Sequence, residues 1–263
     1  MDCLVINLKS APDRMNFMSD QLENLNLNYK RLDAISIDGL ISSKNEKYWE
    51  TWERPIKLTE RACFLSHIKA WEKVKNINRP LLILEDDAIL SSDIKNILHV
   101  IFKYEKIDYV TLEVRNRKKL LMKHNKYLLP GYTLTRLLQD RSGAAAYILW
   151  PSGAKKLLKR ASKQAALADA LICKSYELSS YQIEPACAVQ LDTAEIYGLK
   201  SPISSISYIN AGDNFGRPDL RQFNGIKYKI KRVYAQLRMA VRHLSNILQA
   251  KRRYVKFNKK NFL

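Results

Sequence analysis

The chain has 263 residues, of which 46% are hydrophobic and 27% charged, and its formal net charge is +19. This length suits one large or two small globular domains with a substantial core. No apolar run approaches the roughly 20 residues that a membrane span needs, and we expect no signal peptide because Asp2 and Asn7 interrupt the first apolar segment. The four cysteines form no CxxC pair and no zinc-binding spacing, so we expect reduced thiols in a cytoplasmic protein.

The first part of the chain predicts two strands and a helix. An apolar, β-rich segment at 3–8 predicts a buried strand. Pro12 can begin a helix, because apolar residues recur after it at spacings of three and four. Residues 29–35 predict a second short strand, and residues 49–55 predict a loop.

A longer helix and a third strand follow. Thr59 can cap a helix in which Phe64, Ile68 and Trp71 lie on one face. Residues 81–84, LLIL, predict a buried strand.

The next elements continue the alternation. Ser91 and Ser92 can cap an amphipathic helix that ends near Tyr104. Residues 108–112 predict another strand, and the basic stretch 115–126 predicts a loop.

A strand, a Pro-Ser-Gly turn and a helix are predicted over residues 143–161. Alternating strands and helices are typical of an α/β fold whose sheet is largely parallel. We expect one globular unit over residues 1–216, followed by a separate segment, residues 217–263.

The segment 217–263 differs from the rest in charge. It holds fourteen Lys or Arg and one acid, Asp219, a net charge of +13, whereas the preceding residues carry only +6. Apolar residues between the cations keep helical spacing, and residues 226–263 contain neither Gly nor Pro. The pattern predicts one long amphipathic helix, or two shorter ones, whose partner is anionic.

Three consecutive carboxylates, Glu85, Asp86 and Asp87, directly follow the strand at 81–84. In open α/β sheets, ligands bind beyond the carboxyl ends of the strands. Adjacent carboxylates repel one another unless a cation neutralises them, and oxygen ligands suit Mg²⁺ or Mn²⁺ held together with substrate phosphates. The structural alternative is an exposed acidic turn that favours the start of the helix at Ser91.

Several short motifs occur in a characteristic order and spacing. They are INL-x4-DR, DA, C-x2-SH, LEDD and G-x3-Y, beginning at Ile6, Asp33, Cys63, Leu84 and Gly143 and followed by a later Asp and a Pro. In this combination the chain resembles the family 25 glycosyltransferases, the bacterial lipooligosaccharide galactosyltransferases and their relatives, over roughly residues 1–192.

The resemblance implies a GT-A-like, Rossmann-type fold with a mostly parallel sheet flanked by helices. It implies transfer of a hexose, usually galactose from UDP-galactose, with a divalent metal, Mn²⁺ or Mg²⁺. The acidic motif would replace the usual DxD, with Glu85 and Asp87 as metal ligands, Asp87 the first choice, and Asp86 as a donor contact.

Five further residues are assigned to the donor through the matched motifs. Asn7, Arg14 and Asp33 would line the nucleotide side, with Ser66 and His67 beside them. Structural alternatives exist for several of them: Asn7 can cap a strand, Arg14 can be a solvated helix residue, and Asp33 can begin a turn. His67 is equally compatible with a hydrogen-bonded core histidine.

Family members are taken to invert the anomeric centre, which requires a base for the acceptor hydroxyl. Asp169 lies where the family often has an Asp and is our candidate, the alternative being an exposed helix residue. The acceptor would be a lipooligosaccharide or lipopolysaccharide glycolipid, or an oligosaccharide.

The sequence departs from the family pattern in two places. Thr59-Glu60-Arg61-Ala62 stands where Gly-Glu-x-Gly is frequent, and Trp150 stands where a Ser commonly follows the G-x3-Y strand. These departures put the donor sugar and the acceptor in question more than the fold.

The basic segment has three interpretations. Its helix can lie on an anionic membrane surface, which would place the protein on the inner face of the cytoplasmic membrane, close to a glycolipid acceptor. It can instead pack on the globular unit with its charges solvated. A metal-dependent nucleic-acid-binding enzyme or phosphotransferase is the alternative function, although no nucleic-acid-binding motif or Walker loop accompanies the basic residues, so nucleic acid is not the expected partner.

Overall fold

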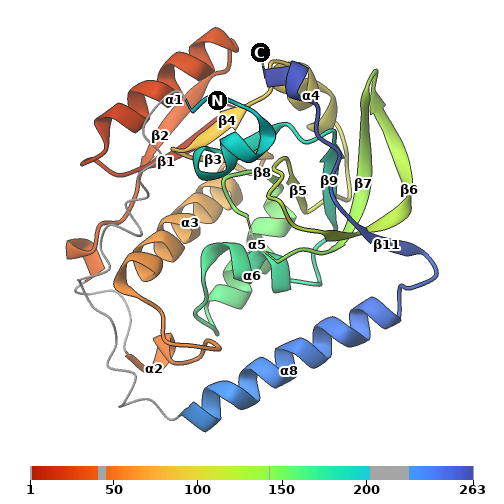
Figure 1. Ribbon diagram of the computed structural model, residues 1–263. Helices are drawn as coiled ribbons and strands as arrows, with labels where there is room; N and C mark the ends of the chain where they lie inside the picture. Colours follow the sequence, from red (N-terminus) through yellow and green to blue (C-terminus); the bar gives the residue numbers. More distant parts are fainter. Residues whose placement is uncertain (1, 41–45, 142, 202–224, 263) are drawn as a thin grey trace.

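A mixed β-sheet forms the centre of the computed structural model, which describes residues 2–40, 46–141, 143–201 and 225–262 (Figure 1). Within these residues the strand order is β11-β6-β7-β9-β5-β8-β3-β1-β2. The strands of this sheet are β1 (Cys3–Asn7), β2 (Tyr29–Asp33), β3 (Leu81–Glu85), β5 (Tyr109–Thr111), β6 (Lys119–Leu129), β7 (Tyr132–Gln139), β8 (Ala146–Leu149), β9 (Ser180–Glu184) and β11 (Ala250–Arg253). A second, two-stranded sheet consists of β4 (Ala88–Leu90) and β10 (Ala188–Gln190).

Helices cover both faces of the large sheet. The helical elements are α1 (Pro12–Asn24), η1 (Asp38–Leu40), α2 (Glu46–Trp49), α3 (Leu58–Ile77), α4 (Ile94–Ile101), α5 (Pro151–Ala161), α6 (Ala168–Lys174), η2 (Leu191–Tyr197), α8 (Gly225–Leu244) and η4 (Lys259–Phe262). Helices α1 and α4 lie on one face, and α3, α5 and α6 lie on the other (Figure 1). The predicted α/β class, with a sheet flanked by helices, is confirmed. The sheet was expected to be largely parallel but is mixed, because hairpins and the insertion of β8 between β3 and β5 add antiparallel pairs.

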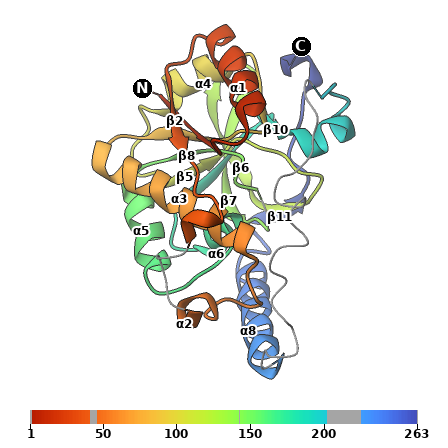
Figure 2. The same ribbon diagram turned by 90° about the vertical axis from the view of Figure 1, so that its left-hand side faces the viewer.

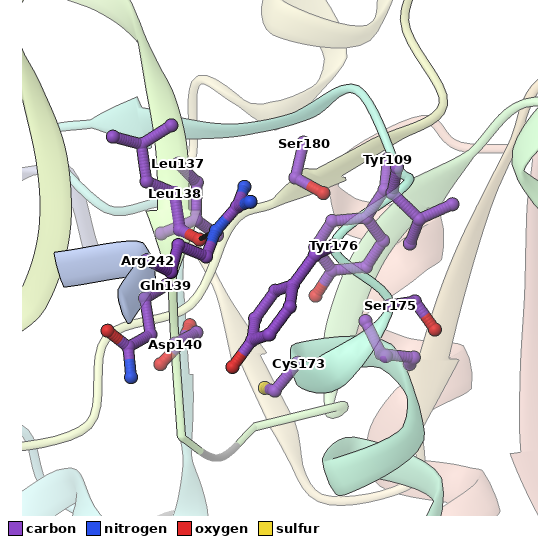
Figure 3. A pocket seen from close by; sticks show the side chains of 12 residues that line it. Tyr109, Leu137, Leu138, Gln139, Asp140, Cys173, Ser175, Tyr176, Ser180 and Arg242 are labelled. Atoms are coloured by element: carbon purple, nitrogen blue, oxygen red, sulfur yellow. Dashed lines mark hydrogen bonds between the residues drawn. The ribbon is translucent and has the colours of Figure 1, made fainter. Parts of the chain in front are cut away.

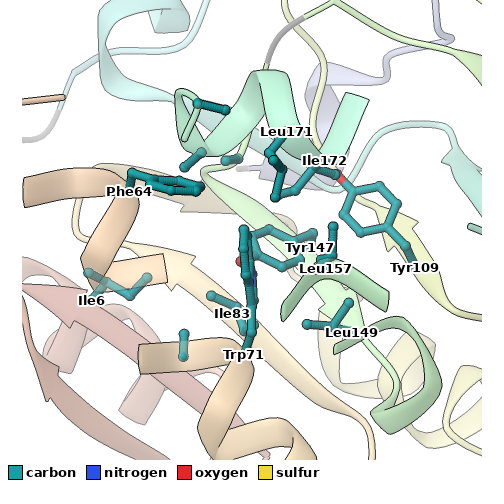
Figure 4. Packing of buried hydrophobic residues seen from close by; sticks show 14 of the residues in the cluster. Ile6, Phe64, Trp71, Ile83, Tyr109, Tyr147, Leu149, Leu157, Leu171 and Ile172 are labelled. Atoms are coloured by element: carbon teal, nitrogen blue, oxygen red, sulfur yellow. The ribbon is translucent and has the colours of Figure 1, made fainter. Parts of the chain in front are cut away.

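The side chains of each central strand divide between two hydrophobic clusters because successive residues point to opposite faces. In β1, Leu4 and Ile6 join the cluster under α3, whereas Cys3 and Val5 join the cluster under α1. Such a strand is apolar throughout, which explains why it was recognisable from sequence. Figure 4 shows the α3 side, where Trp71 lies beside side chains of the sheet.

Parallel pairing is concentrated where the acidic motif lies. Strand β1 pairs in parallel with both β2 and β3, and Asn7 is in register with Asp33 while Ile6 is in register with Glu85. Strands β5 and β9 are also parallel, and the remaining pairs are antiparallel. The carboxyl ends of β1, β2 and β3 therefore meet at one edge, the usual position of a ligand site in an α/β sheet.

The predicted helix starts need correction. Helix α3 is preceded by Lys57, whose backbone N–H donates to Glu60 in a capping-box arrangement, so Thr59 lies inside the first turn. Helix α4 starts after Asp93, rather than after Ser91 or Ser92, and ends at Ile101. The short strand β4, residues 88–90, precedes it and was not predicted.

The predicted loop at 115–126 was wrong. Most of it belongs to β6, which forms a hairpin with β7. The basic and polar residues in the middle of this strand are exposed, so its sequence lacks the apolar alternation that identifies a half-buried strand.

The basic C-terminal segment is helical only in part. Helix α8 ends at Leu244, and β11 then pairs with the edge strand β6. Backbone pairing and burial of Val255 override the helical periodicity of the sequence in this part. The expected boundary between residues 216 and 217 lies outside the described residues. No helix in the described part of the chain combines the length and the apolarity needed to cross a bilayer.

Candidate active site

A cavity of 460 Å³ opens at the edge where β1, β2 and β3 end. Its walls come from the start of α1, the loop after β2, the first half of α3 and the acidic motif. The charged and polar side chains that line it are Ser10, Arg14, Ser36, Asp38, Thr59, Ser66, His67, Glu85, Asp86 and Asp87. The topology thus brings together residues that are more than 70 positions apart in sequence.

Asp86 is held by two residues of the INL-x4-DR motif. Asn7 is fully buried and donates from Nδ2 to Asp86 Oδ2 at 2.7 Å, and Arg14 Nη1 lies 2.9 Å from Asp86 Oδ1. Burial raises the pKa of Asp86, although Arg14 and Asn7 favour the charged carboxylate. Asn7 does not line the cavity itself, and it contacts the site through the Asp86 carboxylate that it shares with Arg14.

Glu85 and Asp87 share one amide donor. Gln190 Nε2 lies 3.2 Å from Glu85 Oε2 and 3.3 Å from both carboxylate oxygens of Asp87. Antiparallel pairing of β10 with β4 places Gln190 here, because β4 directly follows the acidic motif. Burial raises the pKa of Asp87 to about 7, and the charges of Glu85 and Asp86 add to that rise.

His67 belongs to a buried hydrogen-bond chain that ends at Glu85. Trp71 Nε1 donates to the Tyr147 hydroxyl at 2.9 Å, and the same hydroxyl lies 2.9 Å from His67 Nδ1. The hydroxyl therefore has its hydrogen free for Nδ1, which leaves Nε2–H to donate to Glu85 Oε1 at 3.1 Å. This chain fixes the orientation of a carboxylate at the mouth of the cavity.

Tyr147→Phe tests this chain. The variant leaves Trp71 Nε1 and His67 Nδ1 without a partner, and an unsatisfied buried polar group costs about 1–3 kcal/mol. We expect a lower melting temperature and weaker donor binding, because Glu85 loses its fixed position. Tyr132→Phe is the matched control, since its hydroxyl donates to Asp93 on the other side of the sheet. It should lower stability without changing donor affinity; equal losses of affinity in both variants would contradict a specific role for the chain.

Ser66 lines the first cavity and connects two of its walls. Its hydroxyl donates to Ala62 O within α3 and accepts from Ile35 N of the loop after β2, each at 2.8 Å. The C-x2-SH motif thus joins α3 to that loop through Ser66 and to the acidic motif through His67.

A second cavity of 180 Å³ adjoins the first, and Cys63 and Glu85 line both. Asp169, at the start of α6, lies in this second cavity, and the structure brings it to the same site as the acidic motif. Burial raises the pKa of Asp169, and the charge of Glu85 contributes to the rise.

The backbone conformation and the surroundings of Gly143 explain why the G-x3-Y motif has glycine at this position. Gly143 has φ +110°, and a Cβ added there would lie 1.3 Å from Glu113 Oε1. Its backbone also hydrogen-bonds the Asp169 carboxylate. Glycine is therefore required at position 143, just before β8, where the backbone passes close to Glu113 and Asp169.

Asp33 is the sequence-assigned residue that the structure leaves outside this arrangement. Its side chain forms ion pairs with Lys9 and Arg31 at the surface and does not line either cavity. Asp38 lines the first cavity instead, on η1, where no sequence motif marked it. Gln190 was also missed, because only the pairing of β10 with β4 brings it over the acids.

The donor atoms fit a divalent cation. Glu85 and Asp87 both accept from the uncharged Gln190 amide. Arg14 pairs with Asp86, and His67 contacts Glu85. The raised pKa of Asp87, about 7, shows that its charged form is disfavoured by desolvation and by the neighbouring acids. A bound cation would stabilise that charged form. Cys63, His67 and Glu85 also present ligand atoms within 4.8 Å of one another, but that set is softer than Mg²⁺ or Mn²⁺ prefers.

Of the two departures from the family pattern, one lines the first cavity and the other lies in the hydrophobic core. Thr59 and Ala62 line the first cavity, where their side chains occupy space that glycine would leave open. Trp150 is buried at the start of α5, and its Nε1 donates to Tyr104 O, so it serves packing.

Comparison with known proteins agrees with the motifs. A model of the glycosyltransferase family 25 (LPS biosynthesis protein) matches residues 1–172. The lipooligosaccharide biosynthesis protein lic2B of Haemophilus influenzae is 26% identical over 71% of this chain and 74% of its own length. Procollagen galactosyltransferase 1-A of Xenopus laevis is 25% identical over 60% of this chain but only 28% of its own length.

Similarity to solved structures is low. A Drosophila β1,4-galactosyltransferase 7 mutant, in complex with manganese, UDP-Gal and xylobiose, covers 82% of this chain and 80% of its own, with 6% identity and a TM-score of 0.37.

Proposed function

The chain belongs to glycosyltransferase family 25, and from this membership we propose that it transfers a hexose, with UDP-galactose as the first candidate donor, to a saccharide of lipooligosaccharide or lipopolysaccharide. The observation that carries the proposal is the cavity in which Arg14, Glu85 and Asp87 meet at the carboxyl ends of parallel strands. Its volume of 460 Å³ is of the size that small-molecule sites usually have.

In this proposal the nucleotide sugar occupies the first cavity. Arg14, fixed by Asp86, offers positive charge to the diphosphate, and Ser66 and His67 hold the walls in place. Glu85 and Asp87 are the residues that would hold Mn²⁺ or Mg²⁺. When bound, such a cation offsets the negative charge that develops on the departing UDP.

The acceptor occupies the second cavity. Asp169 takes the proton from an acceptor hydroxyl, whose oxygen forms the new bond to the anomeric carbon as the bond from that carbon to the UDP oxygen breaks. Attack from the side opposite UDP inverts the anomeric configuration. The position of Asp169 supports this role, because its cavity shares Cys63 and Glu85 with the donor cavity.

The basic C-terminal segment, residues 217–263, is proposed to meet the anionic inner surface of the cytoplasmic membrane. Its net charge of +13 supports this contact, since each Lys or Arg near such a surface contributes about 1 kcal/mol. An enzyme held there would act beside a glycolipid acceptor.

A donor screen tests the proposed function. The melting temperature of the purified protein is measured with UDP-, GDP- and CMP-sugars, each with and without Mn²⁺. A bound ligand stabilises the native state by RT ln(1 + [L]/Kd), so we expect the largest rise with UDP-galactose and Mn²⁺ together. No rise with any nucleotide sugar would contradict the donor assignment, and a rise with a different sugar would correct it.

A further inference from the structure

Helix α8 contacts the body of the protein through its basic side chains. Lys231 Nζ donates to the carbonyl oxygens of Glu50 and Trp52, at 2.6 and 3.3 Å. Arg242 donates to the Leu138 carbonyl oxygen and lies over the Tyr176 ring, 4.6 Å from its centroid. Figure 3 shows Arg242 reaching in beside Leu138 and Tyr176. Lys231 and Arg242 therefore attach α8 to the rest of the protein, whereas the basic side chains of a membrane-bound helix would face the lipid head groups.

The apolar side of α8 is consequently turned outward. Of the side chains on this helix, only Tyr228 is buried. The outward-facing apolar residues, each between 60% and 69% exposed, are Ile226, Ile230, Val233, Tyr234, Leu237, Val241 and Leu244. We call them the α8 stripe. In Figures 1 and 2 the helix lies at the periphery, on the side opposite α1 and α4.

A basic cavity lies beside the C-terminal half of this stripe. It measures 590 Å³ and is enclosed by α8, β6, the end of β7 and β11. Its lining residues are Lys118, Leu120, Gln139, Arg141, Gln236, Met239, Ala240, His243, Leu244 and Arg252, and no Asp or Glu is among them. Within the described residues, Lys118, Arg141 and Arg252 take part in none of the ion pairs.

We propose that this basic cavity binds the phosphate of an anionic membrane lipid while the adjoining α8 stripe enters the apolar boundary of the bilayer. Three cations whose side chains take part in none of the described ion pairs, in a cavity lined by no Asp or Glu, favour a phosphate, and the walls contributed by Met239 and Leu244 favour the first carbons of a lipid chain. Leu244 lines the basic cavity and also belongs to the α8 stripe, so the two surfaces are continuous. A single ligand that covers both must carry a charged head group next to an apolar chain.

The chemistry of the surface selects a lipid over other anionic partners. A nucleic acid would leave the α8 stripe in water, and a soluble sugar phosphate would use the cavity alone. The inference rests on the proposed membrane contact and deepens it, because it names the side chains that bind and the lipid class that they recognise. It does not depend on which sugar is transferred.

Binding to vesicles tests the inference on the full chain. Vesicles of phosphatidylglycerol and phosphatidylethanolamine are compared with vesicles of phosphatidylcholine alone, in a sedimentation assay. The variant Lys118→Gln/Arg141→Gln/Arg252→Gln is expected to bind the anionic vesicles about 100-fold more weakly than the native protein, because each basic residue near an anionic surface contributes about fivefold. All three residues are exposed, so the fold should persist.

The matched control removes the same charge elsewhere. Lys30→Gln/Lys73→Gln/Lys95→Gln changes exposed lysines on β2, α3 and α4, and it should weaken binding by less than about fivefold. Leu237→Ser/Val241→Ser should also weaken binding to anionic vesicles, with unchanged net charge.

The outcomes separate the two claims. If the native protein binds no vesicles, the membrane contact itself is wrong, and with it this inference. If it binds anionic vesicles but the cavity variant and its control bind alike, general charge attraction remains and the cavity is not a lipid site. Concentration-dependent dimerisation that Leu237→Ser/Val241→Ser abolishes, without an effect on vesicle binding, would assign the stripe to a second copy of the chain.

Discussion

Asp87→Asn is expected to lower kcat/KM about 1,000-fold and to abolish cation-dependent donor binding. Asp87 is half-buried beside two other acids, and desolvation raises its pKa to about 7. A cation held at this position would stabilise transition-state charge by several kcal/mol, and about 4 kcal/mol corresponds to the expected loss in rate. The amide has nearly the same shape and can remain near Gln190, so the melting temperature without ligand should not fall.

Its control is Asp20→Asn, which changes an exposed acid on α1. Both variants are titrated with Mn²⁺ in the presence of UDP-galactose, and turnover is measured over the same range. An unchanged Mn²⁺ requirement in Asp87→Asn would contradict the role of Asp87 as a ligand.

Asp169→Asn should lower kcat by about 100- to 10,000-fold, the usual contribution of a positioned general base. Donor affinity should stay close to that of the native protein, because Asp169 lies in the second cavity. Turnover and donor binding are therefore measured separately on the same preparation. A tenfold or larger loss of donor affinity, with kcat preserved, would assign Asp169 to donor binding.

The pH profile gives an independent check on Asp169. A base must be ionised to accept a proton, so the native rate should rise with pH through the pKa of Asp169, which burial places above its ordinary value. The variant should lack that limb of the profile. A native rate independent of pH in the acidic range would argue against a carboxylate base.

The central strands and the acidic motif could be predicted because their signals are local. An apolar run buried on both faces marks β1 and β3, and the carboxyl end of such a strand is where α/β sheets bind ligands. Asn7 and Arg14 are far from Asp86 in sequence, yet the parallel register of β1 with β3 makes them neighbours of Asp86.

Other features depend on long-range pairing that no local pattern reveals. Gln190 reaches the acids only because β10 pairs with β4, and the loop expected at 115–126 becomes β6 through its pairing with β7 and β11. The helical spacing of the C-terminal segment correctly predicted an amphipathic α8. It could not indicate that the basic side would dock on the protein and leave the apolar side outward.

Membership of family 25 also decides between the functions that the sequence left open. The basic segment alone suited a nucleic-acid enzyme as well as a membrane-bound transferase. The family match covers residues 1–172, the part of the chain that contains Arg14, the acidic motif and Asp169. The comparisons therefore favour a glycosyltransferase over the nucleic-acid alternative.

The most direct test of the account is the position of Mn²⁺ in crystals grown with UDP, located by its anomalous scattering. We predict a peak in contact with the Asp87 carboxylate and with the diphosphate of UDP, inside the cavity that Arg14 and Ser66 line. A nucleotide bound elsewhere, or Mn²⁺ that contacts neither Asp87 nor Glu85, would contradict the claim that these acids hold the cation of a sugar-nucleotide donor.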